Sequence, residues 1–276
     1  MSSSPPRYAR VLSIAGSDSG GGAGIQADLK TIAALGGYGM TAITAITVQN
    51  TVGVRAIQAL PAELLAQQID AVAEDIGVDA VKIGMLHDVA VVRAVAAALQ
   101  RHRFPHVVLD PVMVATSGDK LITQDTVAVL IRELFPLATL ITPNLDEAGW
   151  LIGRNIRGVD ELEGAARELL ALGARAVLLK GGHLDGPELT DLLLAPPAAP
   201  QRWSARRIAT RNTHGTGCTL SSAIACQLAL GEPLAAAVQS ARAYVRGALA
   251  AGADVATGHG HGPLNHGFAP QPTRVF

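Results

Sequence analysis

A polar, glycine-bearing turn that leads into an apolar helix is the part of this 276-residue sequence best suited to chemistry. It spans residues 212–224. Gly215 and Gly217 lack side chains, so backbone N–H groups in the turn can approach a ligand closely. The positive end of the following helix dipole points at the same place. The turn is therefore predicted to bind an anion.

Cys218 falls in the first turn of that helix, beside the predicted anion. A helix N-terminus lowers the pKa of a thiol below its usual value of about 8.5, so Cys218 could accept a proton or attack an electrophile. A purely structural interpretation is also open. In that case Thr213 or Thr216 caps the helix, and Cys218 packs as a small core residue.

Two carboxylates and one lysine stand where predicted strands end. Asp110 and Glu147 offer hard oxygen donors that could hold Mg²⁺, directly or through water. Equally, Asp110 before Pro111 could serve only a turn, and Glu147 only a helix N-terminus. Lys180 is less ambiguous, because a lysine at the end of an apolar strand needs an anion or a carboxylate as partner. We expect a phosphate there.

A second glycine-rich turn, residues 16–24, carries one carboxylate, Asp18. Its glycines fit the loose dinucleotide-binding pattern, but no acidic residue follows at the required spacing of about 20 residues. The Gly-Lys-Ser/Thr ending of a Walker A loop is missing too. Residues 17–21 resemble the nucleophile segment of trypsin-like proteases, yet no histidine and aspartate precede them. What remains is a flexible loop that lets Asp18 approach a small substrate.

Bulk composition limits the classes of ligand. The net charge is −1 and only 16% of residues are charged, which argues against nucleic-acid or membrane-surface binding and favours a small ligand. Cys218 and Cys226 lie eight residues apart in one predicted helix, which is typical neither of a disulfide framework nor of a zinc knuckle. A leading apolar segment and a run of about 20 apolar residues are both missing, so we expect a soluble, cytoplasmic protein.

The elements that must position these residues alternate between strands and helices. Residues 1–9 are predicted as a flexible leader and residues 10–276 as a single domain. Strands are predicted at 11–15, 41–48, 54–59, 80–83, 106–110, 139–142, 176–180, 189–194 and 206–210. Helices are predicted over 23–35, from Pro61 with a buried stripe at Leu65, Ile69, Val72 and Ile76, over 89–100, 124–134 and 160–172, and from about 217 and 233.

This alternation indicates βαβ units and an α/β fold with a doubly wound, mostly parallel sheet. Ligands of such folds bind outside the carboxyl ends of the strands. The polar residues described above, with Gln49 and the Gly84-Met85 pair, directly follow predicted strands. We therefore expect all of them to meet at one edge of the sheet.

Taken together, these motifs resemble hydroxymethylpyrimidine/phosphomethylpyrimidine kinases of the ribokinase-like superfamily. The similarity is collinear from about residue 10 to 267. It implies a three-layer α/β/α sandwich and two ATP-dependent phosphorylations, first of 4-amino-5-hydroxymethyl-2-methylpyrimidine and then of its monophosphate, in thiamine biosynthesis. The segments that carry it are Ala15 to Lys30, Gln49-Asn50, Lys82 to Leu86, Asp110 to Met113, Ile141 to Leu145, Leu179 to His183, Thr213 to Thr219 and Gly260 to Pro263.

The resemblance also implies a role for each matching position. Gln49 would bind the aminopyrimidine in a pocket shaped by Gly16, Asp18, Ala23, Met85 and Val112. ATP phosphates would meet Lys180, Asn144, Thr213, Thr216 and the amides of Gly215 and Gly217. Asp110 and Glu147 would organise Mg²⁺. Cys218 would be the general base, at a position where most superfamily kinases carry aspartate.

Two rival functions stay open: a pyridoxal or pyridoxine kinase on the same phosphate machinery, and a non-catalytic pyrimidine-binding regulatory protein. The resemblance further implies a homodimer. The Gly/His-rich loop at 258–266 is two residues longer than the family pattern, and we consider it as a candidate lid.

Overall fold

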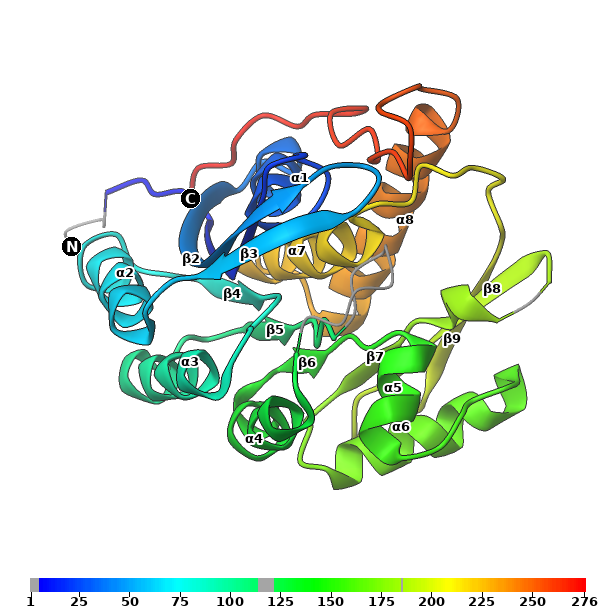
Figure 1. Cartoon of the computed structure of the whole chain (residues 1–276), viewed down its shortest axis with the longest axis horizontal. Helices are drawn as coiled ribbons and strands as arrows, with labels where there is room; N and C mark the ends of the chain where they lie inside the picture. The colour runs from blue at the N-terminus through cyan, green and yellow to red at the C-terminus, as the bar shows by residue number, and fades with distance from the viewer. Residues whose placement is uncertain (1–4, 114–121, 185) are drawn as a thin grey trace.

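A computed structural model of the chain describes residues 5–113, 122–184 and 186–276, and all nine of its named strands join one sheet (Figure 1). The order across the sheet is β3-β2-β1-β4-β5-β6-β7-β8-β9. The parallel strands are β1 (Arg10–Asp18), β2 (Tyr38–Gln49), β4 (Ala80–Ile83), β5 (Val107–Leu109), β6 (Leu140–Ile141) and β7 (Val177–Leu179). Antiparallel pairing adds β3 (Val54–Ala59) beside β2, β8 (Glu188–Leu194) beside β7, and β9 (Gln201–Arg206) beside β8.

Helices cover both faces of this sheet (Figure 1). One face packs α2 (Ala62–Asp75), α3 (Val89–His102), α4 (Gln124–Leu134), α5 (Leu145–Ile152) and α6 (Leu162–Ala171). The other packs α1 (Gly24–Ala34), α7 (Thr216–Ala229) and α8 (Leu234–Gly252). Short 3₁₀ segments occur at Phe135–Leu137, Val159–Glu161 and Gly181–His183. The predicted three-layer α/β/α sandwich is confirmed.

The chain crosses the sheet so that the polar strand ends meet. From β1 it runs to β2 on one side and later to β4 on the other, which places a topological switch point beside β1. Ligands bind at such points because the loops diverge there. Asp18, Gln49, Asp110 and Lys180 end or follow β1, β2, β5 and β7 at the shared carboxyl edge.

Two local predictions were wrong. The expected strand at 206–210 is instead β9 at Gln201–Arg206, because Arg207 leaves the sheet and donates hydrogen bonds to the carbonyls of Gly182, Leu184 and Gly186. Helix α5 was not predicted as an element. The stripe on α2 is also narrower than expected, since Leu65 and Ile69 are buried but Ile76 is exposed.

The expected leader, residues 1–9, joins the fold earlier than its predicted boundary. Arg7 forms an ion pair with Asp79 at 2.8 Å, and Tyr8 forms an antiparallel bridge with Val275 near the other end of the chain. Ala9 is fully buried. Residues 1–4 lie outside the described part. Within the described ranges, no helix has the length and apolarity needed to cross a bilayer.

Candidate active site

A cavity of about 830 Å³ opens at the carboxyl edge of the sheet. Every residue that the sequence analysis singled out as a site residue lines it. These are Gly16, Asp18, Ala23, Gln49, Met85, Asp110, Val112, Asn144, Glu147, Lys180, Thr213, Gly215, Thr216, Gly217 and Cys218. The cavity is large enough to hold two small ligands side by side.

Lys180 and Asp110 form the charged centre of one half of this cavity. Lys180 Nζ lies 2.9 Å from Asp110 Oδ1, which also accepts a 3.0 Å hydrogen bond from the Thr142 hydroxyl. Burial alone would lower the pKa of Lys180, but the charges of Asp110 and Glu147 outweigh it and raise that pKa above its usual value. The lysine therefore stays cationic and has the carboxylate partner that its place in the sequence required.

Glu147 and Asn144 cap the start of α5 reciprocally. The Glu147 carboxylate accepts a hydrogen bond from the Asn144 backbone N–H, and the Asn144 side-chain oxygen accepts one from the Glu147 N–H, both at 2.8 Å. This is a capping box, which explains why a helix begins here. Burial raises the pKa of Glu147 to about 7, opposed by Lys180 and reinforced by Asp110. Glu147 thus supports a helix and also faces the cavity.

The glycine-bearing turn that precedes α7, called the anion turn below, leaves backbone amides exposed to the cavity. Gly215 is the N-cap of α7 with φ of 84°, and the described residues provide α7 with no side-chain cap. Thr216 instead donates its hydroxyl to the Thr213 carbonyl at 2.7 Å, so the interpretation in which Thr213 or Thr216 caps the helix was wrong. The first N–H groups of α7 therefore lack a side-chain acceptor, which suits an anionic ligand.

Glycine is required sterically at position 215 and leaves space at position 217. A Cβ on Gly215 would lie 1.8 Å from the Gly22 carbonyl oxygen, in addition to the strain of its positive φ. A Cβ on Gly217 would lie 3.3 Å from Asp110 Oδ2 and 3.4 Å from Lys180 Nζ. The missing side chain of Gly217 therefore keeps open the space between the helix amides and the charged pair.

Cys218 is half-buried on the cavity wall, and the predicted direction of its pKa was wrong. Burial raises the pKa of this thiol above its usual value, and the nearby charge of Lys82 opposes the rise without cancelling it. The helix N-terminus does not decide the outcome, because desolvation of the thiolate is the larger effect.

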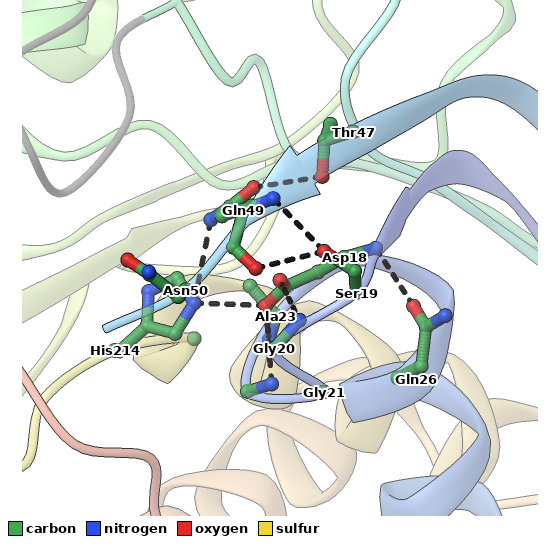
Figure 2. A network of polar contacts seen from close by, with 12 residues as sticks. Asp18, Ser19, Gly20, Gly21, Ala23, Gln26, Thr47, Gln49, Asn50 and His214 are labelled. Atoms are coloured by element: carbon green, nitrogen blue, oxygen red, sulfur yellow. Dashed lines mark hydrogen bonds and ion pairs between the residues drawn. The ribbon is translucent and has the colours of Figure 1, made fainter. Parts of the chain in front are cut away.

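In the other half of the cavity, Asp18 is the centre of a network of polar contacts (Figure 2). Its two carboxylate oxygens accept hydrogen bonds from the N–H groups of Gly20, Gly22 and Ala23, and Oδ2 lies 2.9 Å from His214 Nε2. Burial would raise the pKa of Asp18, but His214 and these amides lower it below its usual value. Because an ionised carboxylate only accepts hydrogen bonds, His214 Nε2 is the donor in this contact.

Gln49 projects its carboxamide into the same half (Figure 2). Its backbone is fixed by Ser19, whose hydroxyl donates to the Gln49 carbonyl at 2.7 Å and accepts from the Gln49 N–H at 2.8 Å. The side-chain oxygen lies 3.1 Å from the Thr47 hydroxyl, and the side-chain nitrogen lies 3.5 Å from His214 Nε2. The carboxamide thus offers one donor and one acceptor to a planar ligand.

Apolar side chains complete the pocket beside Gln49. Met85 and Ala45 form a small buried cluster against which Ile57 and Val112 pack. Gly16 lets Met85 approach, because a Cβ on Gly16 would lie 2.8 Å from the Met85 methyl carbon. A flat ring can therefore lie on an apolar surface with its polar edge toward Gln49.

Comparison with known proteins agrees with this geometry. Residues 18–265 match the model of the family described as phosphomethylpyrimidine kinase. The chain belongs to this family. It is 55% identical over 258 residues to the hydroxymethylpyrimidine/phosphomethylpyrimidine kinase of Rhizobium meliloti, covering 93% of this chain and 96% of that one. It also matches 53% of the length of a thiamine biosynthesis bifunctional protein from Geobacter sulfurreducens, at 51% identity.

Solved structures of relatives have the same fold. The phosphomethylpyrimidine kinase of Clostridium difficile superposes with a TM-score of 0.77 at 44% identity, over 86% of this chain and 97% of that one. An ADP complex of Bacillus subtilis pyridoxal kinase gives a TM-score of 0.87 at 35% identity, over 95% and 98%. Kinases that act on two different rings thus share this architecture.

Within this phosphomethylpyrimidine kinase scaffold, several cavity residues escaped the sequence analysis. Thr47 had no distinguishing pattern, and neither had Thr142, which lies behind the lining and donates to Asp110. His214 had no role assigned from the sequence, because its pairing with Asp18 spans 196 residues. Lys82 did carry a signal: it is a charged residue in an apolar strand, as Lys180 is at the end of one.

The Gly/His-rich loop at 258–266 is docked beside the cavity. The His261 N–H donates to the Thr51 carbonyl, and the Gly262 carbonyl accepts from the His214 N–H. A Cβ on Gly260 would lie 1.9 Å from the Thr51 carbonyl oxygen, so the contact is close. No loop residue, in a segment that the structure describes completely, lines the cavity. In this conformation the loop contacts the anion turn through Gly262 and does not line the cavity.

Proposed function

We propose that this protein phosphorylates 4-amino-5-hydroxymethyl-2-methylpyrimidine with ATP and then phosphorylates the monophosphate to the diphosphate. Its relatives are named hydroxymethylpyrimidine/phosphomethylpyrimidine kinases, which supports the proposal. The proposal rests on one observation, which is that the two halves of a single cavity suit two different ligands. The uncapped start of α7 and the Lys180–Asp110 pair suit a phosphate chain, and Gln49 suits a polar ring edge.

ATP use follows from membership of a kinase family, and the charged half of the cavity fits a triphosphate. Lys180 and the amides of Gly215 and Gly217 would neutralise charge on the transferred phosphoryl group, which is the main task in such reactions. Thr213 would add a hydroxyl donor, and the Thr216 hydroxyl would do so once it releases the Thr213 carbonyl. Asn144 would contribute its amide N–H₂, because its side-chain oxygen already caps α5.

The donor set of the same half fits Mg²⁺. Asp110 and Glu147 are hard oxygen ligands, and the described residues include no group of three or more His, Cys, Asp or Glu side chains placed for a metal ion. Magnesium binds readily to one or two carboxylates with waters and substrate phosphates completing its shell. When bound, the ion would neutralise phosphate charge, and Asp110 and Glu147 would hold it there.

The other half of the cavity would orient the pyrimidine. The Gln49 carboxamide would pair with the ring nitrogen and the exocyclic amino group, which form an acceptor–donor edge of complementary pattern. Gly16, Asp18, Ala23, Met85 and Val112 would shape the surrounding pocket. The hydroxymethyl group would then face Cys218, whose thiolate would accept its proton as the oxygen attacks phosphorus.

A pyridoxal kinase activity is the second candidate, because the Bacillus subtilis pyridoxal kinase superposes closely on this chain. The 55% identity to a pyrimidine kinase favours the pyrimidine. Side-by-side kcat/KM values for the pyrimidine and pyridoxal decide between them. A higher kcat/KM for pyridoxal than for the pyrimidine would reverse the assignment.

We further propose a homodimer, a cytoplasmic location and a single catalytic domain. Ile46, Val48 and Val52 are exposed apolar residues on β2 and on the turn to β3 at the edge of the sheet, where a second copy could cover them. The free thiols of Cys218 and Cys226 fit a reducing compartment. Light scattering at micromolar concentration tests the dimer.

The decisive experiment is mass-spectrometric detection of products from Mg-ATP and the pyrimidine. We expect the monophosphate first and the diphosphate later. If a folded protein gives neither product nor ADP, the non-catalytic binding function replaces the kinase.

A further inference from the structure

A fully buried ion pair lies behind the cavity wall. Lys82 on β4 and Asp28 on α1 are both 0% exposed, and Lys82 Nζ lies 2.8 and 2.9 Å from the two carboxylate oxygens. Two serines complete the cluster: Ser13 donates to Asp28 at 2.5 Å and Ser222 at 2.6 Å. Desolvating two charges is costly even where they pair with each other, so this cluster calls for an explanation beyond packing.

The pair is oriented with its positive end toward the cavity. In the described part of the chain, the cavity lining includes Lys82 but not Asp28. Gly84 leaves room for the ammonium group, because a Cβ on Gly84 would lie 2.9 Å from Lys82 Nζ. Burial would lower the pKa of Lys82, but Asp28 chiefly, with Cys218 and Asp110, raises it well above its usual value. Lys82 therefore remains a cation.

The same cluster is tied to the helix that carries Cys218. Ser222 follows Cys218 by one turn on α7, so the two side chains lie on the same face of the helix. The hydrogen bond from Ser222 to Asp28 thus fixes this face of α7 against the ion pair. Two elements of the wall, β4 and α7, are held together directly below the thiol.

The charges that face Cys218 come from four elements. Lys82 on β4 acts to stabilise the thiolate, whereas Asp28 on α1 and Asp110 after β5 act against it. Lys180 after β7 also interacts with the thiol and favours the thiolate. The backbone N–H of Gly24, at the start of α1, adds a further favourable contribution. Lys82 makes the largest favourable contribution to the thiolate and opposes the cost of burying it.

We propose that the Lys82–Asp28 pair is an oriented positioning device that stabilises the Cys218 thiolate and so enables it to act as general base. The proposal rests on the base role assigned above. In that step the hydroxymethyl O–H bond breaks as an S–H bond forms on Cys218, and a new P–O bond replaces the bond to ADP. Lys82 keeps its proton throughout and acts only through its field.

Both partners are needed for this role. A lone buried lysine loses its proton because burial disfavours the charged form. Asp28 keeps Lys82 protonated, while Ser13 and Ser222 hold the carboxylate outside the cavity lining. The field at the thiol is then positive although the pair has no net charge.

The test replaces both charges at once, in the variant Lys82→Met with Asp28→Asn. Replacing a buried ion pair with neutral groups of similar volume often preserves stability. The rate of Cys218 alkylation by iodoacetamide is followed against pH by peptide mass spectrometry. We expect the midpoint to move up by at least about one pH unit, and kcat for the first phosphorylation at pH 7.5 to fall about tenfold. An unshifted midpoint in a folded double variant overturns the proposal.

Matched controls separate this effect from a general loss of ion pairing. Arg10 and Asp79 form an ion pair outside the cavity lining, so Arg10→Met with Asp79→Asn should leave the midpoint of Cys218 unchanged. If the double variant does not fold, Ser222→Ala offers a milder change. It should slow alkylation at pH 7.5 about twofold, whereas Ser221→Ala, which loses bonds only to helix carbonyls, should not. Equal rates in both serine variants contradict the proposal.

Failure of the base role is distinguishable from failure of this inference. If Cys218→Ala retains its kcat, then the thiol is not the base. The alkylation midpoint still reports whether Lys82 and Asp28 control the thiolate.

Discussion

His214 Nε2 lies 2.9 Å from Asp18 Oδ2, and this contact joins two glycine-bearing turns that are 196 residues apart in the sequence (Figure 2). The turns also touch directly, since a Cβ on Gly215 would lie 1.8 Å from the Gly22 carbonyl oxygen. Direct contacts therefore connect the two halves of the cavity, and changes at this junction should affect both.

Asp18→Asn is expected to weaken binding of both substrates. The variant loses the charge that holds three turn amides and His214, so both turns shift. Hydrogen bonds to a charged group contribute about 1.5–3 kcal/mol each, which predicts at least tenfold increases in KM for the pyrimidine and for ATP. Steady-state kinetics with each substrate varied in turn provide the measurement. An effect on the pyrimidine alone would show that the halves are independent.

Gln49→Ala is expected to affect one substrate only. The variant removes the donor and acceptor offered to the ring but leaves the charged half intact, so KM for the pyrimidine should rise at least tenfold while KM for ATP changes less than twofold. Gln58→Ala on β3 is the matched control, because its side chain donates only to the adjacent Ala59 carbonyl. Equal weakening of both ligands by Gln49→Ala contradicts the assignment.

Cys218→Ala is expected to separate the two phosphorylations. General base catalysis contributes about 10²- to 10⁴-fold, so kcat for the hydroxymethyl group should fall at least about a hundredfold with little change in binding. The monophosphate is largely ionised at neutral pH, since its second pKa is about 6, and needs no base. Its phosphorylation should therefore fall much less. Cys226→Ala is the control, because Cys226 lies outside the cavity lining. If kcat of the first step falls less than tenfold in Cys218→Ala, the thiol has only a packing role.

Acid should destabilise the fold through His266. Burial, with a smaller effect of Lys30, lowers the pKa of His266 to about 4. The unfolded chain, with a histidine pKa of about 6.5, then binds a proton that the folded chain excludes. Stability is therefore full above pH 6.5 and is lost as the pH falls toward 4, by about 2 kcal/mol from this group at pH 5.

Urea unfolding at pH 7.5 and pH 5 tests this linkage. His266→Gln removes the titrating group, so its free energy of unfolding should fall by about 2 kcal/mol less than that of the unchanged protein over the same interval. Equal losses in the two proteins would show that His266 is not the group responsible.

Much of the fold follows from local pattern. Alternation of apolar strands and helices predicted the layers, and the polar residues at strand ends predicted which edge holds the cavity. The strand expected at 206–210 failed because Arg207 bonds to the carbonyls of a distant loop. Such contacts leave no periodic signal in the sequence.

The chemistry of the site was less predictable than its location. The pKa of Cys218 depends on how deeply the fold buries the thiol and on the charge of Lys82 from another element, and neither follows from a helix N-terminus alone. The Asp18–His214 contact likewise depends on the strand order, which brings together residues 196 positions apart in the sequence. Residue types identified the participants, and the tertiary arrangement set their protonation.

The pairing of the chain ends has a consequence for engineering. Arg7 and Phe276 exchange backbone hydrogen bonds, Tyr8 pairs with Val275, and the two ends lie side by side in Figure 1, with neither segment in the cavity lining. A short linker across this seam would close the chain with little loop-entropy cost, so new termini could be opened in a surface turn elsewhere. A circular permutant made in this way should keep the sheet order, and a reporter domain attached at the seam would leave the cavity open to substrate.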